Sequence, residues 1–142
     1  MGARAALLAT IVAAAACGGT PQPGDPGYEY NVEGSYVVDF AANDGQTYTG
    51  TMALTTGEGG VVTGSMSLTS PVSVDGTVEG SVIGAQLSLD VQYFIPDNQC
   101  GGVVIATGTI AQGGGTASGA ASIQADDDCQ GGPTSADFTL TR

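Results

Sequence analysis

Two short acidic stretches, each ending in a cysteine, hold the residues of this sequence that are best suited to chemistry. Residues 97–100 read Asp-Asn-Gln-Cys, and residues 126–129 read Asp-Asp-Asp-Cys. A disulfide between the two cysteines would bring together four carboxylates, those of Asp97, Asp126, Asp127 and Asp128. Hard oxygen ligands in that number suit Ca²⁺. No EF-hand or glycine-aspartate repeat surrounds them, so an acidic loop that is simply solvated is the alternative.

Composition excludes most other chemistry. The chain has fourteen carboxylates against Arg4 and Arg142 alone, a formal net charge of −12, and no histidine. A nucleic-acid ligand needs cations to displace its counterions, so we expect no such partner. Nucleophiles activated by histidine and imidazole metal sites cannot be assembled either. Most carboxylates fall at outward strand positions or in turns, which disfavours paired acids for hydrolysis. We therefore expect no catalytic residues, no enzymatic activity and no cofactor other than Ca²⁺.

Residues 1–16, MGARAALLATIVAAAA, have the organisation of an export signal. Positive charge at Arg4 and the amino terminus precedes an apolar run from Ala5 to Ala16. This run is shorter than the roughly 20 residues that a membrane-spanning helix requires. It also ends in small residues, as cleaved signal peptides do. The sequence therefore predicts a signal peptide rather than a transmembrane helix.

The end of this signal, Ala14 to Cys17, resembles the lipobox of bacterial lipoproteins, with alanine where a larger residue such as leucine is usual. The resemblance implies that Cys17 becomes the mature amino terminus and carries diacylglycerol in thioether linkage, with further acyl chains such as palmitate. Gly18 and Gly19 follow it instead of aspartate, which by the same resemblance favours the outer membrane, on either of its faces. An ordinary secretory peptide with a coincidental cysteine is the alternative.

Cys100 and Cys129 remain once Cys17 is assigned to the lipid. Export places them in an oxidising compartment, where two remaining thiols usually pair. No cation nearby in the sequence would activate either thiol, which argues against a reactive cysteine. We expect a disulfide that closes a loop of about thirty residues and stabilises the fold by roughly 3–4 kcal/mol.

Residues 17–33 form a proline- and glycine-rich tether, in which Tyr28 and Tyr30 are expected to pack onto the barrel end, with a contact motif as the alternative. Polar and apolar residues then alternate with a period of two through residues 34–142. Turn sequences rich in glycine divide this region into eight expected strands. They are residues 34–40, 48–55, 62–69, 72–78, 85–93, 103–110, 116–125 and 136–141. Each has one apolar face, so the sheet must close or be covered. An all-β, eight-stranded antiparallel up-and-down barrel is predicted, with a β-sandwich as the alternative.

Glycine stands beside a hydroxyl residue repeatedly in this region. GTMALTT at residues 50–56 returns as GSMSLTS at residues 64–70, and further pairs lie at 76–77, 80–81 and 108–109. The period of two places each glycine inward and each hydroxyl outward. Inward glycine lets a strongly coiled strand bend and lets neighbouring backbones approach. We interpret the pairs as a means of closing a narrow barrel, because a phosphate loop would need a following helix and a lysine.

The two ends of the barrel region resemble those of calycins, the small barrels of lipocalins and avidins. The first strand opens with Gly34-Ser35-Tyr36 where calycins have Gly-x-Trp. Arg142 directly follows the last strand, where lipocalins have a basic residue that packs across this tryptophan. The resemblance implies that Arg142 stacks on Tyr36 to close the barrel, and it favours ligand binding. The tryptophans of the avidin site are absent, so no ligand-contacting residue is carried over.

Together these observations favour a bacterial envelope lipoprotein, monomeric and anchored to the bilayer through acylated Cys17, whose calycin-like barrel binds a small apolar ligand in its mouth. The alternatives are a non-catalytic structural or interaction lipoprotein with a filled barrel, and Ca²⁺ binding at the acidic loops. A cavity larger than about 300 Å³ that opens at one end would favour ligand binding, whereas a filled interior would favour the structural alternative.

Replacing the predicted lipidation residue tests the anchor. Cys17→Ser should move the protein out of the membrane fraction, because the acyl chains supply its attachment to the bilayer. Fractionation of expressing cells followed by immunoblotting measures this. Cys100→Ser, which leaves Cys17 intact, is the matched control and should stay with the membrane; unchanged pelleting of Cys17→Ser would refute the anchor.

Overall fold

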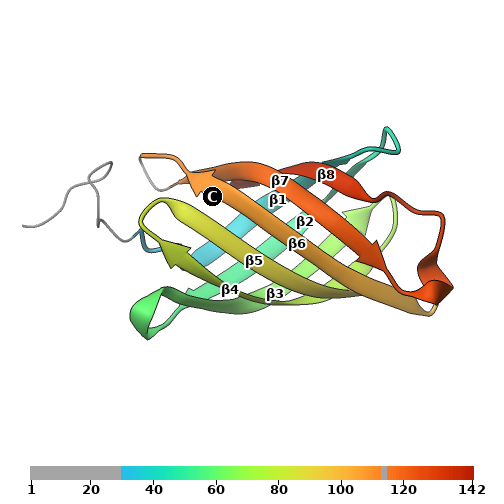
Figure 1. Cartoon of the computed structure of the whole chain (residues 1–142), viewed down its shortest axis with the longest axis horizontal. Helices are drawn as coiled ribbons and strands as arrows, with labels where there is room; N and C mark the ends of the chain where they lie inside the picture. The colour runs from blue at the N-terminus through green and yellow to red at the C-terminus, as the bar shows by residue number, and fades with distance from the viewer. Residues whose placement is uncertain (1–29, 113–114) are drawn as a thin grey trace, which may run out of the picture.

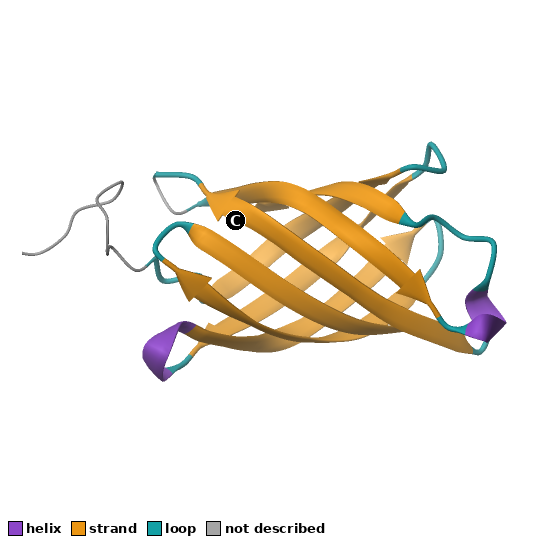
Figure 2. Ribbon diagram, viewed as in Figure 1, coloured by secondary structure: helices purple, strands orange, loops and turns teal. Residues whose placement is uncertain are grey.

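A computed structural model describes residues 30–112 and 115–142, which form one closed β-barrel. Its elements are β1 (Gly34–Ala42), β2 (Thr47–Thr56), η1 (Glu58–Gly60), β3 (Val61–Ser70), β4 (Val74–Ile83), β5 (Gln86–Ile95), β6 (Cys100–Ile110), β7 (Thr116–Ala125), η2 (Asp127–Cys129) and β8 (Ser135–Thr141), where η marks a short 3-10 helix. Each strand pairs antiparallel with the next, and β8 pairs with β1 (Figure 1 and Figure 2). The predicted eight-stranded up-and-down barrel is confirmed and the sandwich is excluded.

The alternation of residue types along each strand sorts side chains between the interior and the surface. In β3, for example, Val62, Met66 and Leu68 are buried while the threonine and serines between them are exposed. No charged side chain is buried in the described part of the chain.

Within residues 30–112 and 115–142, no helix has the length and apolar character needed to cross a membrane. The sheet closes on itself within residues 34–142, so no other part of the chain is needed to complete it.

Two strands extend furthest beyond the ends that the sequence predicted. The expected strand at residues 72–78 is observed as β4, which begins at Val74 and continues to Ile83, and the expected strand at 103–110 begins at Cys100. In both cases a glycine-containing stretch that resembles a turn continues the strand. Residues 79–81 of β4 pair with β5, and residues 101–102 of β6 pair with Phe94 and Tyr93. Glycine therefore occurs within the strands of this barrel more often than its low strand propensity would suggest.

The inward glycines lie opposite large core side chains. The register pairs Gly50 with Leu68, Gly64 with Leu54, Gly80 with Leu89, Gly108 with Leu87 and Gly119 with Phe138. A Cβ atom on Gly64 would collide with the carbonyl oxygen of Ala53 on the neighbouring strand. The missing side chain thus permits close approach of adjacent backbones and leaves volume that the opposite large residue fills. This is the close approach that the sequence pattern predicted.

Arg142 and Tyr36 meet at one end of the barrel, which we call the closed end. The guanidinium carbon of Arg142 lies 5.2 Å from the centroid of the Tyr36 ring. Its Nε and Nη2 atoms donate to Tyr36 Oη at 3.1 and 2.9 Å, and Tyr36 Oη donates to the carbonyl oxygen of Val32 at 2.6 Å. Arg142 therefore stacks on Tyr36 as expected from the sequence, and hydrogen bonds reinforce the contact.

Residues 30–33, which the sequence analysis assigned to the tether, are part of the barrel domain. Tyr30 packs onto the closed end as expected and is buried, as is Val32. Arg142 Nη2 also donates to the carbonyl oxygens of Asn31 and Glu33 at 2.9 and 2.8 Å. Burial and these hydrogen bonds hold residues 30–33 against the closed end. The predicted signal peptide, Cys17 and the rest of the tether lie outside the described residues.

Adding one methyl group at an inward glycine tests the close approach of the strands. Gly64→Ala should lower the free energy of unfolding by roughly 1–3 kcal/mol, because the new Cβ forces adjacent backbones apart. Thermal or urea denaturation measures the change. The matched control is Ser65→Ala on the outward face of the same strand, expected within about 0.5 kcal/mol of wild type. Equal stability of Gly64→Ala and Ser65→Ala would contradict the interpretation.

Candidate ligand-binding cavity

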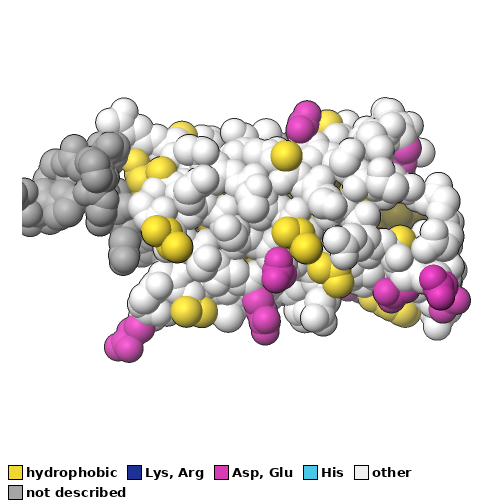
Figure 3. All heavy atoms as spheres, in the orientation of Figure 1, with side chains coloured by type: hydrophobic (Ala, Val, Ile, Leu, Met, Phe, Trp, Pro, Cys, Tyr) yellow, Lys and Arg dark blue, Asp and Glu magenta, His cyan; other side chains and the backbone are white. Residues whose placement is uncertain are grey.

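The end of the barrel opposite Arg142, which we call the open end, contains a cavity of about 370 Å³. The turns that follow β1, β3, β5 and β7 surround it, because alternate connections of an up-and-down barrel lie at the same end. Figure 3 shows the surface hollowed here, near the end of the molecule that lies away from the grey segment, with hydrophobic atoms inside the hollow. The cavity is therefore a feature of the barrel interior and reaches solvent at this end.

Five side chains that line the cavity are buried, and we call them its floor: Phe40, Met66, Leu68, Val74 and Val104. All five are apolar. Behind Phe40 lies Phe138, with ring centroids 6.3 Å apart and the rings tilted by 41°. Toward the closed end the interior is packed, since a second void beside Tyr36 and Leu140 measures only about 10 Å³. The interior is thus filled at one end and hollow at the other.

Half-buried residues form the wall: Tyr48, Val72, Tyr93, Ile95 and Ile123. Tyr93 pairs with Gly76 and Gly102 on its two neighbouring strands. A Cβ atom on Gly102 would lie 2.7 Å from Tyr93 Oη. Glycine at position 102 therefore makes room for the tyrosine hydroxyl on the wall.

Two tyrosines in the wall lie near carboxylates. Tyr48 Oη donates to Asp44 Oδ2 at 2.9 Å. Burial first, and then this hydrogen bond and the charge of Asp44, raise the pKa of Tyr48 to about 12. Burial raises the pKa of Tyr93 as well, with a further contribution from the charge of Asp126. Both phenols therefore stay neutral across the physiological pH range and present aromatic surface to the cavity.

The predicted disulfide between Cys100 and Cys129 is confirmed, with their Cα atoms 5.4 Å apart. Cys100 is the first residue of β6 and is buried, whereas Cys129 lies in η2. Cys129 and the residues next to it, 128 and 130–133, form one side of the rim. The disulfide therefore ties this part of the rim to the barrel wall.

A side-chain contact holds the other end of the same loop. Asn43, in the turn after β1, donates from Nδ2 to Thr134 Oγ1 at 2.9 Å and accepts a hydrogen bond from Thr134 N at 3.0 Å. At the first end, Asp126 N donates to the carbonyl oxygen of Gly101 at 2.9 Å. The loop between β7 and β8 is thus anchored on both sides, which gives the cavity mouth a defined shape.

The four aspartates predicted as a Ca²⁺ site do not converge. Asp97 lies in the turn between β5 and β6, Asp126 precedes η2, and Asp127 and Asp128 lie within η2. Among the described residues, no group of three or more carboxylate, cysteine or histidine side chains is arranged to hold a metal ion. The disulfide does bring the two loops together, but successive residues of a 3-10 helix point in different directions. Only Asp128 of the four lines the cavity.

Sequence reasoning predicted strands with one apolar, inward face but did not identify which inward positions border a void. The structure places Phe40, Tyr48 and Tyr93 around the cavity. The signal that could have indicated the hollow end is the small size of its inward residues, since Gly76, Gly102 and Ala125 lie in register beside Tyr93.

No known protein family, curated protein or solved structure matches this chain. The geometry alone therefore defines the class of protein: a closed antiparallel barrel, packed at one end, with an apolar cavity at the other.

The raised pKa of Tyr48 gives a test of the mouth geometry. Tyr48 should ionise near pH 12, whereas the ordinary value is 10.0. Because the folded state holds this proton more tightly than the unfolded chain, stability should fall as the pH rises from the lower value towards the higher one. Asp44→Asn removes the hydrogen-bonded carboxylate and should lower the pKa of Tyr48, with burial still keeping it above its ordinary value.

The ultraviolet absorbance of the phenolate, taken as the difference between each protein and the same protein with Tyr48→Phe, isolates the titration of Tyr48. Asp90→Asn, an exposed substitution on β5, is the matched control and should leave it unchanged. A Tyr48 titration that Asp44→Asn does not move would show that this contact is not formed in solution.

Proposed function

We propose that this domain is the non-catalytic binding module of a bacterial envelope lipoprotein, and that it takes a small apolar molecule into the cavity at its open end. The observation that carries the proposal is the cavity of about 370 Å³ with an apolar floor. Ligand sites are typically concave and largely pre-formed, with volumes of about 300–1,000 Å³ and mostly apolar linings that carry a few polar groups. Tyr48, Tyr93 and Asn98 are polar groups of this kind.

The uneven packing of the interior supports ligand binding over the structural alternative. A barrel that served only as a scaffold would gain stability from larger side chains in place of the void, since an empty apolar cavity forfeits dispersion contacts. The closed end has such packing around Tyr36 and Leu140, where the void is about 10 Å³. An apolar ligand would supply the missing contacts at the open end.

The position of the predicted anchor is compatible with this function. The described chain begins at residue 30 at the closed end (Figure 1), and the residues that line the cavity lie at the opposite end. An anchor at Cys17 would therefore attach to the domain on the side away from the mouth. A molecule in the surrounding aqueous compartment could then reach the cavity without passing the attachment point.

Filling the cavity tests the proposal. The chain from Gly18 onward, which contains the whole described domain and lacks the acylated cysteine, should bind the neutral fluorophore N-phenylnaphthylamine saturably, with one site per chain. Val72→Trp places a large ring in the cavity and should weaken binding by about tenfold or more. Fluorescence titration measures the affinity, and thermal unfolding verifies that each variant is folded.

The matched control is Val37→Trp, which adds the same ring on the outer face of β1, where Val37 is 51% exposed. It should bind the fluorophore as the wild type does. Absence of saturable binding to the wild type, or equal weakening by the two substitutions, would reject the cavity as the binding site.

A further inference from the structure

Carboxylates flank the mouth of the cavity on two sides. Asp128, in η2, lines the cavity itself. Asp126, just before η2, is close enough to Tyr93 for its charge to act on that phenol. Asp44, in the turn after β1, accepts the hydrogen bond of Tyr48 Oη at 2.9 Å. A ligand whose body fills the cavity must therefore place its outer end among negative charges.

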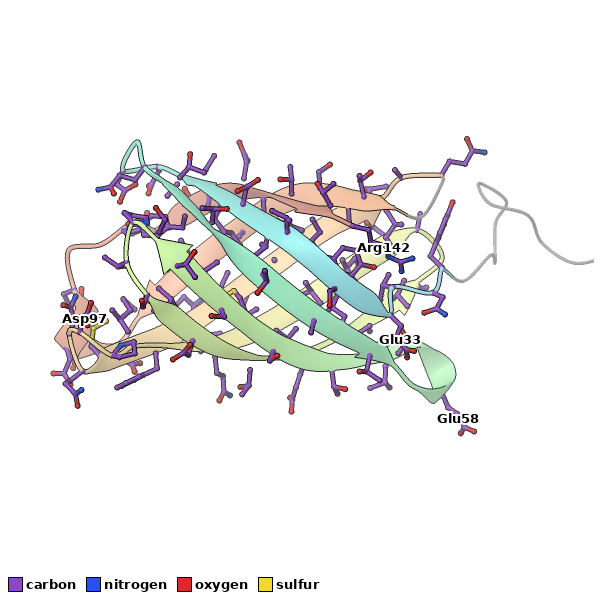
Figure 4. The ribbon with its side chains drawn as sticks, turned by 180° about the vertical axis from the view of Figure 1, so that it is seen from behind. Glu33, Glu58, Asp97 and Arg142 are labelled. Carbon is purple, nitrogen blue, oxygen red and sulfur yellow. A yellow bond between two sulfur atoms is a disulfide. The ribbon has the colours of Figure 1, made fainter. Side chains whose placement is uncertain are left out.

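No cation of the described residues offsets this charge at the mouth. Arg142 is the only lysine or arginine within residues 30–112 and 115–142. It lies at the closed end, where its guanidinium group is bound to Tyr36 Oη and two main-chain carbonyl oxygens. Figure 4 shows Arg142 at one end of the barrel and Asp97, in the turn next to Asn98 of the cavity lining, at the other. Among the described residues, an anionic ligand would find no counter-charge at the cavity.

The neutral groups around the cavity also favour a positive charge. The rings of Phe40, Tyr48 and Tyr93 line it, and an aromatic face attracts a cation within about 6 Å of its centre. The side-chain oxygen of Asn98 at the rim can accept hydrogen bonds from an ammonium group. Burying the charge of a carboxylate ligand among Asp44, Asp126 and Asp128 would be opposed both by desolvation and by repulsion.

From these observations, and resting on the proposed function, we infer that the cavity selects small cationic amphiphiles: molecules with an apolar alkyl or aryl body that fills the cavity and an ammonium group held at the rim beside Asp128. The apolar floor provides the affinity for the body of the ligand, and the rim carboxylates make a positively charged ligand bind more tightly than a negatively charged one.

Three decyl compounds with the same apolar chain test the choice of charge: decyltrimethylammonium, decanol and decanoate. Each is used below its micelle concentration to displace N-phenylnaphthylamine from the chain that starts at Gly18. Decyltrimethylammonium should displace the fluorophore at a concentration about tenfold lower than decanoate, with decanol between them. The difference should shrink in 1 M salt, where the screening length falls to about 3 Å.

Removing one carboxylate charge at the rim tests whether Asp128 causes the preference for cationic ligands. Asp128→Asn should reduce the ratio between the cationic and anionic compounds by about threefold and leave decanol unchanged. Glu58→Gln removes one charge from exposed η1 at the closed end and is the matched control, expected to keep the ratio.

The outcomes separate the two proposals. If the neutral fluorophore does not bind the wild type, the proposed function fails. If it binds but decanoate displaces it as well as decyltrimethylammonium does, the cavity binds ligands without the charge preference and this inference alone is overturned. If Asp128→Asn and Glu58→Gln change the ratio equally, the preference arises from net charge and the rim has no special part in it, which also overturns the inference.

Discussion

The pairing of β8 with β1 is the constraint on which the rest of this structure depends. Six residue pairs, from Val37 with Thr141 to Ala42 with Ala136, join the first strand to the last. Once that seam forms, the barrel has no unpaired edge and its strand number fixes its width, so each inward position faces a shared interior. Glycine at inward positions makes so tight a closure sterically possible, because a Cβ at Gly50 or Gly64 would meet the backbone of the neighbouring strand.

The same closure explains why the two ends differ. At the closed end, Arg142 follows directly after the seam and reaches across it to Tyr36 and to the chain before β1, so the interior there is covered and packed. At the open end, the covering chain is the loop between β7 and β8, which the Cys100–Cys129 disulfide holds at the wall. This loop borders the cavity at the rim and leaves its interior unfilled.

The sequence was sufficient for the architecture because a period of two, interrupted by turns, admits few arrangements of a sheet with one apolar face. The eight strands, the disulfide and the contact of Arg142 with Tyr36 all agree with the sequence analysis. The cavity could not be derived in the same way. Its volume depends on which side chains oppose one another across the barrel, and this depends on strand register and stagger. The extensions of β4 through Gly80 and of β6 through Gly101 were missed because glycine signals a turn equally well.

The separation of Arg142 from the acidic turns also gives the domain an electric dipole along the barrel axis. Asp44, Asp97 and the three aspartates of residues 126–128 lie at the open end, while the closed end carries Arg142 together with the carboxylates of Glu33 and Glu58, so the open end is the more negative of the two. An anionic lipid surface repels the first end more strongly than the second within about a Debye length. Beside such a bilayer, electrostatic repulsion would favour orientations of the domain in which the open end, with its cavity, points away from the lipid.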